Sequence, residues 1–247
     1  MKQRPPTLVV IPAYNEEAAL PGVLSELRRT VTAEDVLVVD DGSTDATSAV
    51  ARDAGVLVAT LPFNLGIGAA LRTGFQYAVR HGYPRVVQFD ADGQHDAEAI
   101  ERLYEALDDG ADMVIGSRFR ATERDYDVGF FRGGAMELLR IFIQLAVGRR
   151  FTDTSSGFRA FGPRALELFS RAYPAEYMDS VEAILLAIYA GLRVDEVPTP
   201  MRDRVAGRPS TRNLKLVYHY LRVLLVMFFT VTLRRGLPSD HEPEARL

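Results

Sequence analysis

The chain has 247 residues, nearly half of them hydrophobic, with 29 lysines and arginines, 33 acidic residues and no cysteine. This length is enough for one large domain with a substantial core. The net charge of -4 argues against a protein that binds nucleic acid through a broad basic face. The lack of cysteine excludes disulfides, thiolate metal sites and cysteine nucleophiles, so we expect a cytoplasmic protein.

In the first half of the chain, short apolar runs alternate with longer segments of helical spacing. We expect strands at 8–11, 36–39, 56–61, 86–89 and 113–115, separated by helices at 16–30, 45–54, 67–80 and 96–107. Strands that are apolar along their whole length and separated by helices indicate a mostly parallel sheet covered on both faces. The fold class is therefore α/β, and ligands of such sheets bind beyond the carboxyl ends of the strands.

The second half is less regular. It predicts long helices at 131–147 and 214–233, a buried helix at 180–190, a strand at 193–198 and a disordered tail at 236–247. The first apolar run is about five residues long, too short for a signal peptide. The most hydrophobic run, 223–233, is about half of what spans a bilayer. We therefore expect no membrane span.

Acidic residues follow the predicted strands and would gather at one edge of the sheet. Asp40 and Asp41 end the second strand, and Asp90, Asp92 and Gln94 follow the fourth. Packed carboxylates repel each other unless a cation or a hydrogen-bonding ligand compensates them. Asp90 and Asp92 are spaced so that both can direct oxygen atoms at one Mg²⁺ or Mn²⁺ ion, with Gln94 adding a carbonyl oxygen. Single aspartates at strand ends, however, are also ordinary turn formers.

Six motifs in this order carry a resemblance to a known family. They are residues 10–17 (VIPAYNEE), 38–45 (VVDDGSTD), 64–68 (NLGIG), 90–94 (DADGQ), 116–118 (GSR) and 156–159 (SGFR). The set resembles glycosyltransferase family 2, with its GT-A fold, and within it the branch of dolichyl-phosphate mannose synthases and polyprenyl-phosphate glycosyltransferases. The resemblance implies an inverting enzyme that moves a sugar from a UDP- or GDP-sugar to a polyprenyl phosphate.

The resemblance also implies roles for particular residues. The donor nucleotide would contact Pro12, Tyr14, Glu16, Asp40, Gly66, Asp90 and Ala91. The metal ion would bind Asp90, Asp92 and Gln94. The acceptor phosphate would contact Arg118, Arg132, Arg159 and Ser210, and the catalytic residues would be Asp92, Arg118 and Arg204. Guanidinium groups suit phosphate because they are permanently charged and donate in pairs.

A polyprenyl phosphate is already ionised near neutral pH, whereas a sugar hydroxyl needs a general base. Relatives with hydroxyl acceptors commonly carry a Glu-Asp pair that is absent here in its usual form, although Asp179 or Glu182 stays open as a base. Direct transfer to a glycan is therefore the alternative reaction, and a silent sugar-nucleotide-binding scaffold is the non-enzymatic one. A serine common in the branch is replaced by Met136, which removes one expected acceptor contact.

The resemblance divides an expected single domain, residues 1–235, into a nucleotide-sugar half (1–118), an acceptor half (119–212) and an interface helix (213–235). In the last helix Lys215, His219 and Arg222 recur on one face of an otherwise apolar cylinder. This pattern is typical of helices that lie in a membrane interface. We expect peripheral binding to the inner face of the membrane, directly or through a small membrane protein, with burial in a homodimer as the alternative.

Overall fold

The computed structural model describes residues 5–30, 35–119, 144, 148–174, 179–200 and 202. The chain separates into two units, residues 1–127 with 151–210, and residues 128–150 with 211–247. Apart from 144 and 148–150, the described residues belong to the first unit. The predicted helix at 214–233, the tail and nearly all of the helix at 131–147 lie outside the described residues. The predicted single domain over 1–235 stays a prediction.

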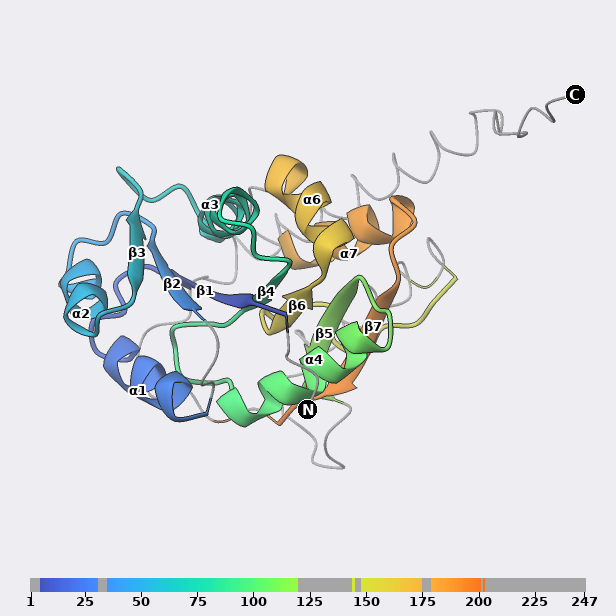
Figure 1. Ribbon diagram of the computed structural model, residues 1–247, viewed down its shortest axis with the longest axis horizontal. Coiled ribbons are helices and arrows are strands. Elements are labelled where there is room, and N and C mark those ends of the chain that lie inside the picture. The colour runs from blue at the N-terminus through green and yellow to red at the C-terminus, as the bar shows by residue number, and fades with distance from the viewer. Residues whose placement is uncertain are drawn as a thin grey trace, which may run out of the picture. The chain divides into compact units, whose positions relative to one another are not determined.

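A mixed sheet forms the centre of the first unit (Figure 1). Its strands are β1 (Thr7–Ala13), β2 (Asp35–Asp40), β3 (Leu57–Thr60), β4 (Arg85–Gln88), β5 (Met113–Ser117), β6 (Arg159–Phe161) and β7 (Val194–Pro198). They lie in the order β3-β2-β1-β4-β6-β5-β7. Every pairing is parallel except those of β6, which runs antiparallel to both β4 and β5. The expected mostly parallel α/β sheet is confirmed.

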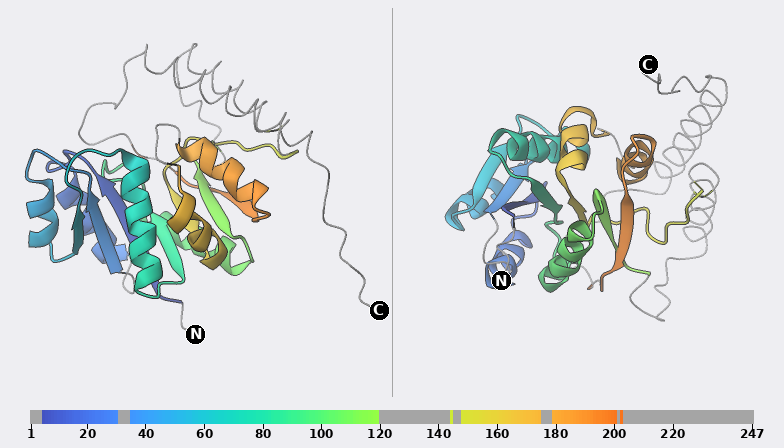
Figure 2. Two further views of the ribbon diagram at one scale, coloured as in Figure 1. Left: turned by 90° about the horizontal axis from the view of Figure 1, so that it is seen from above. Right: turned by 45° about the vertical axis from the view of Figure 1, so that its right-hand side comes forward.

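Helices cover both faces of this sheet (Figures 1 and 2). They are α1 (Leu20–Thr30), α2 (Thr47–Asp53), α3 (Ile67–Arg80), the 3-10 turn η1 (Ala97–Ala99), α4 (Ile100–Asp108), α6 (Pro163–Ala172) and α7 (Asp179–Tyr189). In Figure 1, α1 and α4 lie below the sheet, and α3, α6 and α7 lie above it. The crossovers between parallel strands therefore bury both faces, as the continuous apolar runs predict.

The alternation of side chains along β1 divides the core between the two faces. Val9 and Ile11 are fully buried in the cluster formed with α1 and α4. Val10 points the other way, toward α3, where a Cβ on Gly74 would lie 2.4 Å from its Cγ1. Glycine at this position lets α3 pack directly on the central strand. Phe75 of α3 extends this side of the core into an aromatic group with α6.

The element boundaries differ from the prediction in ways that have physical causes. The first helix begins at Leu20 rather than at residue 16, because the preceding residues form a separate turn in which the carbonyl oxygen of Glu16 accepts from the N–H groups of Ala19 and Leu20 at 3.2 and 3.0 Å. β6 and α6 were not expected. β6 is three residues long and begins with Arg159, so it lacks the apolar run that reveals the other strands.

Candidate functional site

The candidate site lies where the carboxyl ends of β2, β1 and β4 meet at one edge of the sheet. β1 lies between the other two, with Ala13 beside Asp40 and Val10 beside Gln88. β5 is parallel to β4 across the antiparallel β6, so β5 ends at this edge and β6 begins there with Arg159. The topology therefore gathers at one edge the motifs that follow β1, β2, β4 and β5 and the motif that precedes β6.

The loops after β1 and β2 are joined by hydrogen bonds around Asn15. Its backbone N–H donates to Ser43 Oγ at 2.9 Å, and its side-chain oxygen accepts from the N–H of Thr44 at 2.8 Å. Asn15 has a φ of 55°, in the left-handed region that asparagine tolerates better than most residues. This turn leaves Tyr14 exposed at the edge. Two further predicted nucleotide contacts are partly buried, Pro12 near the end of β1 and Glu16 in the loop.

The acidic pair at the end of β2 is satisfied by donors within the protein. Asp40 is buried, and its oxygens accept from the N–H of Ser43 at 2.9 Å and from the hydroxyl of Ser48. Asp41 is also buried and accepts from two backbone N–H groups just before α3, at 2.7 and 2.8 Å. Burial raises the pKa of Asp41, and the two N–H groups offset this rise only in part. Both carboxylates therefore shape the turns of this edge, including the one at Gly66.

In the acidic pair after β4, Asp90 and Asp92, the hydrogen bonds differ from those of the pair at the end of β2. Asp90 Oδ2 lies 2.9 Å from His95 Nε2, and 27% of the Asp90 side chain is exposed. Its other oxygen, Oδ1, is enclosed and has no hydrogen-bond partner among the described residues. A Cβ on Gly157 would lie 2.5 Å from Oδ2 and 2.7 Å from Oδ1, so glycine is needed for the carboxylate to stay in place. An unsatisfied buried acceptor costs about 1–3 kcal/mol, which a ligand would recover.

The charge state of Asp90 follows from its neighbours. Burial raises the pKa of Asp90, but the charge and hydrogen bond of His95, the nearby side-chain amide of Gln88 and the charge of Arg159 outweigh it, so the pKa is lowered. The carboxylate is therefore ionised at neutral pH. Because an ionised carboxylate only accepts hydrogen bonds, Nε2 of His95 must carry the hydrogen between them.

Asp92 belongs to a loop that is anchored on both sides. Its Oδ1 accepts from the N–H of Gln94 at 3.1 Å, and the carbonyl oxygen of Gln94 accepts from the N–H of Arg202 at 2.9 Å. The Arg202 guanidinium in turn pairs with Glu26 at 2.8 Å and with Asp96 at 3.2 Å. In the described part of the chain, no three Asp, Glu, His or Cys side chains converge into a complete metal cluster.

Arg118, at the end of β5, is held by a buried acid. Its Nε and Nη2 donate to the two oxygens of Asp153 at 2.6 and 2.8 Å, and Nη2 also donates to Ser155 Oγ at 2.7 Å. Asp153 is 0% exposed, whereas the Arg118 side chain is 21% exposed. Burial raises the pKa of Asp153, and the hydrogen bonds and charge of Arg118 outweigh this and lower it. The bidentate pair fixes the plane of the guanidinium at the edge of the site.

Arg159 is placed differently from Arg118. It is 0% exposed, and its Nε and Nη2 donate to the backbone carbonyls of Ser156 and Thr154 at 2.8 and 3.3 Å. Its Nη1 has no partner among the described residues. Its charge therefore acts in the interior, where it lowers the pKa of Asp90. The predicted nucleotide contact Ala91 is also buried, as part of the core.

Some predicted residues cannot be compared with the structure, and some residues of the edge were not predicted. Arg132, Arg204 and Ser210 lie outside the described residues. His95 and Asp153 were missed, because a lone histidine after the acidic motif and a lone aspartate before the SGFR motif are ordinary surface residues by pattern. The only sequence signal was their nearness to a motif.

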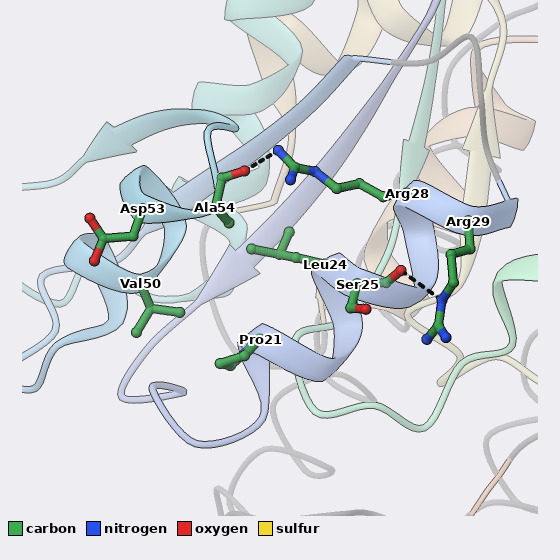
Figure 3. Close-up of a pocket in the computed structure, with 8 residues that line it drawn as sticks. All are labelled: Pro21, Leu24, Ser25, Arg28, Arg29, Val50, Asp53 and Ala54. Atoms are coloured by element: carbon green, nitrogen blue, oxygen red, sulfur yellow. Dashed lines mark hydrogen bonds between the residues drawn. The ribbon is translucent and has the colours of Figure 1, made fainter.

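Two further findings concern the rest of the described chain. A groove of about 510 Å³ between α1 and α2 (Figure 3) contains none of the predicted site residues, so it is separate from the candidate site. Its lining residues are Pro21, Leu24, Ser25, Arg28, Arg29, Val50, Asp53 and Ala54. None of the helices within the described ranges is long and apolar enough to cross a membrane.

Comparison with solved structures agrees with the fold. The glucosyl-3-phosphoglycerate synthase of Mycobacterium tuberculosis, crystallised with Mn²⁺, UDP and glucosyl-3-phosphoglycerate, superposes with a TM-score of 0.69. The alignment covers 96% of this chain and 82% of that chain, at 21% sequence identity. The likeness supports the GT-A fold that the motifs implied.

Comparison of sequences is more specific. The polyprenol monophosphomannose synthase of Mycolicibacterium smegmatis is 34% identical over 211 residues, which cover 81% of this chain and 79% of that protein. The undecaprenyl-phosphate mannosyltransferase of Micrococcus luteus is 34% identical over 208 residues, with 81% and 85% covered. Residues 8–167 match the model of glycosyl transferase family 2, which is more than half of the chain. The chain therefore belongs to glycosyl transferase family 2.

Proposed function

We propose that this glycosyltransferase moves a sugar from a UDP- or GDP-sugar to a polyprenyl phosphate, with inversion at the sugar carbon. The observation that carries the proposal is the acidic edge after β4, where one enclosed oxygen of Asp90, next to Asp92 in the motif, has no hydrogen-bond partner among the residues that the structure describes. The names of the two mannosyltransferase relatives, which concern polyprenol and undecaprenyl phosphate, support the lipid acceptor.

The residues after β4 fit a hard divalent ion, Mg²⁺ or Mn²⁺. Asp90 and Asp92 would supply carboxylate oxygens, and Gln94 would add its side-chain carbonyl. Two observations support such a site: Oδ1 of Asp90 has no hydrogen-bond partner within the described ranges, and Gly157 has no Cβ that would clash with this carboxylate. When bound, the ion would neutralise the negative charge that develops on the donor diphosphate as it leaves. Mn²⁺ in the fold neighbour is a property of that protein, so the metal proposal rests on these side chains.

The protein's own residues would position two anionic groups close together. On the donor side, Tyr14 is exposed beside the turn of Asn15, where it can stack on a base. On the acceptor side, Arg118 is fixed by Asp153 and would hold the phosphate oxygen that attacks the sugar. A phosphate acceptor is already ionised, so no side chain has to remove a proton. Positioning and charge neutralisation then supply the catalysis.

The remaining acceptor contacts in this proposal are Arg132, Arg204 and Ser210. Arg159 would have to reach the phosphate through its buried Nη1.

We place the reaction at the cytoplasmic face of the membrane, with peripheral attachment through residues 213–235. The basic stripe of Lys215, His219 and Arg222 supports this, because each basic residue near an anionic surface contributes about 1 kcal/mol.

The test is a transfer assay with purified protein, Mn²⁺, a panel of UDP- and GDP-sugars, and either a polyprenyl phosphate or the matching polyprenol. We expect a glycosylated polyprenyl phosphate by mass spectrometry from one class of donor and no product from the polyprenol. Product from the polyprenol or from a glycan acceptor would instead support transfer to a hydroxyl group. Donor binding without any turnover would support a silent scaffold.

A further inference from the structure

His95 is a buried histidine that the proposed reaction does not use directly. Its side chain is 1% exposed, and its ring stacks on Phe158 with centroids 4.9 Å apart and planes 21° apart. The ring of Phe89 meets it edge-on at 5.5 Å. An imidazole enclosed by two aromatic rings has little freedom to turn, so the direction of its Nε2–H is set by the core.

That N–H points at one oxygen of Asp90, at 2.9 Å from Oδ2. On another side of the same carboxylate, Gly157 leaves just enough room for both oxygens. Asp90 is therefore held by a donor and confined by backbone, while its Oδ1 is left without a partner in the described part of the chain. His95 therefore occupies Oδ2, and Oδ1 is the carboxylate oxygen to which no donor is assigned in that part of the chain.

We propose that His95 is a positioning residue, which holds Asp90 Oδ2 so that Oδ1 is directed at the divalent ion of the donor complex. The proposal rests on the metal site of the proposed function. Without the N–H, Oδ2 would lose its hydrogen-bond donor, and the carboxylate would no longer be held in one orientation. Partners of this kind, one step removed from the metal, typically change metal affinity by about ten- to a hundredfold when they are removed.

Two substitutions separate positioning from simple packing. His95→Phe keeps an aromatic ring against Phe158 but removes the donor. His95→Gln gives up the stacking but can place an amide N–H near the position of Nε2. A residue that only fills the core should tolerate phenylalanine better than glutamine, whereas a positioning donor should tolerate glutamine better.

The matched control is His81→Phe. His81 follows the last turn of α3, is exposed, and stacks on Tyr77 rather than on any residue of the site. α3 begins at the site edge and its 14 residues extend about 21 Å from it, so His81 lies at the opposite edge of the sheet. The substitution makes the same chemical change far from Asp90.

The experiment measures Mn²⁺ affinity from the electron paramagnetic resonance signal of free Mn²⁺, with UDP and separately with GDP, together with thermal unfolding of each variant. We expect affinity about ten- to a hundredfold weaker in His95→Phe, within a few-fold of wild type in His95→Gln, and unchanged in His81→Phe. In the transfer assay, the Mn²⁺ concentration for half-maximal rate should rise in His95→Phe and be largely restored in His95→Gln.

A second substitution, at Gly157, disturbs the Asp90 carboxylate on a side that His95 does not contact. Gly157→Ala would place a Cβ within 2.5 Å of Asp90 Oδ2, so it should also weaken Mn²⁺ binding, and it remains informative if His95→Phe fails to fold. Wild-type Mn²⁺ affinity in folded His95→Phe, or in Gly157→Ala, would overturn the positioning role. If His95→Phe and Gly157→Ala bind Mn²⁺ as the wild type does but Asp92→Asn does not, the positioning role of His95 is wrong while the proposed metal site is still supported. No Mn²⁺ binding by the wild type with either nucleotide would overturn both proposals.

Discussion

The acidic pairs that end β2 and follow β4 look alike in the sequence but differ in the structure. At the end of β2, the oxygens of Asp40 and Asp41 accept hydrogen bonds from the protein's own N–H and O–H groups. After β4, Asp90 has one oxygen held by His95 and another with no partner among the described residues. The difference shows that acidic residues with the same position in the sequence pattern can have different roles, and it is the reason why we assign the proposed metal site to the pair after β4.

Asp153 belongs with the first pair by this criterion. Both of its oxygens accept from Arg118, and it is fully buried. We therefore expect substitutions of Asp41 and Asp153 to act mainly on folding or on the orientation of a neighbour. Substitutions of the acids after β4 should act mainly on metal binding and turnover.

The largest effect is expected for Asp92→Asn. It keeps the side-chain volume but removes a charge, so the rate of sugar transfer should fall on the order of a thousandfold, about 4 kcal/mol of transition-state stabilisation. The thermal unfolding midpoint should change little, because a buried charge is removed together with its desolvation penalty. Steady-state rates and calorimetry on the same preparation check both parts. Wild-type turnover by this variant would show that Asp92, like Asp41 and Asp153, acts on the fold rather than on metal binding.

Asp153→Asn should be the most destabilising substitution among the acids that accept only from the protein. It breaks the bidentate pair with Arg118 and should reduce the free energy of unfolding by about 3 kcal/mol, the lower end for buried pairs because Arg118 is partly exposed. Urea denaturation at neutral pH measures this loss. An unchanged midpoint would show that the pair contributes nothing to the fold.

The same pair predicts a pH dependence. The pKa of Asp153 is lowered in the folded protein, below its ordinary value of 3.8. Its contribution to stability is therefore fully present above that value and is lost as pH falls through the folded pKa. The difference in stability between wild type and Asp153→Asn should be constant near neutral pH and shrink below about pH 4. Denaturation series at several pH values follow it, and a gap that widens on acidification would contradict the assigned direction.

Arg118→Lys separates charge from geometry. Lysine keeps the positive charge but loses the paired N–H groups that fit both oxygens of Asp153. We expect about a tenfold lower rate with polyprenyl phosphate, about 1.4 kcal/mol, mostly through a raised KM for the acceptor. Initial rates over a range of acceptor concentrations distinguish this from a donor defect. An effect on the KM of the nucleotide sugar alone would remove Arg118 from the acceptor side.

The smallest effect is expected for Asp41→Asn. One of the two N–H groups before α3 would lose its acceptor, which should destabilise the fold by about 1 kcal/mol. The affinity for Mn²⁺ with nucleotide should stay as in wild type, because both oxygens of Asp41 accept hydrogen bonds from that backbone. Thermal unfolding and Mn²⁺ titration measure the two quantities. A loss of Mn²⁺ binding comparable to that of Asp92→Asn would contradict the different roles assigned to the acidic pairs at the end of β2 and after β4.

The sequence predicted most of the fold because its central strands are buried on both faces. β1 and β5 appear as uninterrupted apolar runs, and α3 was predicted with the bounds that the structure gives it. β6 and α6 could not be found this way. β6 is short, begins with a buried arginine, and is stabilised by pairing with strands far away in the sequence.

The candidate site could be predicted only at the level of its motifs. The spacing of Asp90 and Asp92 indicated oxygen ligands at a strand end, and the topology brings them to the expected edge. The sequence could not show which carboxylates already accept hydrogen bonds within the protein, because their donors are distant in the sequence. The N–H groups before α3 that donate to Asp41 are an example. Only the structure likewise shows that Asp90 is paired with His95 and that Arg118 is paired with Asp153.

The most direct test of the account is the metal dependence of transfer to polyprenyl phosphate. Wild-type protein is stripped of metal, supplied with the donor and acceptor that support product formation, and titrated with Mn²⁺, then with excess chelator, then with Mn²⁺ again. We expect no product without metal, a rate that rises and saturates with Mn²⁺, loss of the rate in chelator and its return when Mn²⁺ is added again. Undiminished transfer in excess chelator would contradict the assignment of Asp90 and Asp92 as the metal-binding acids.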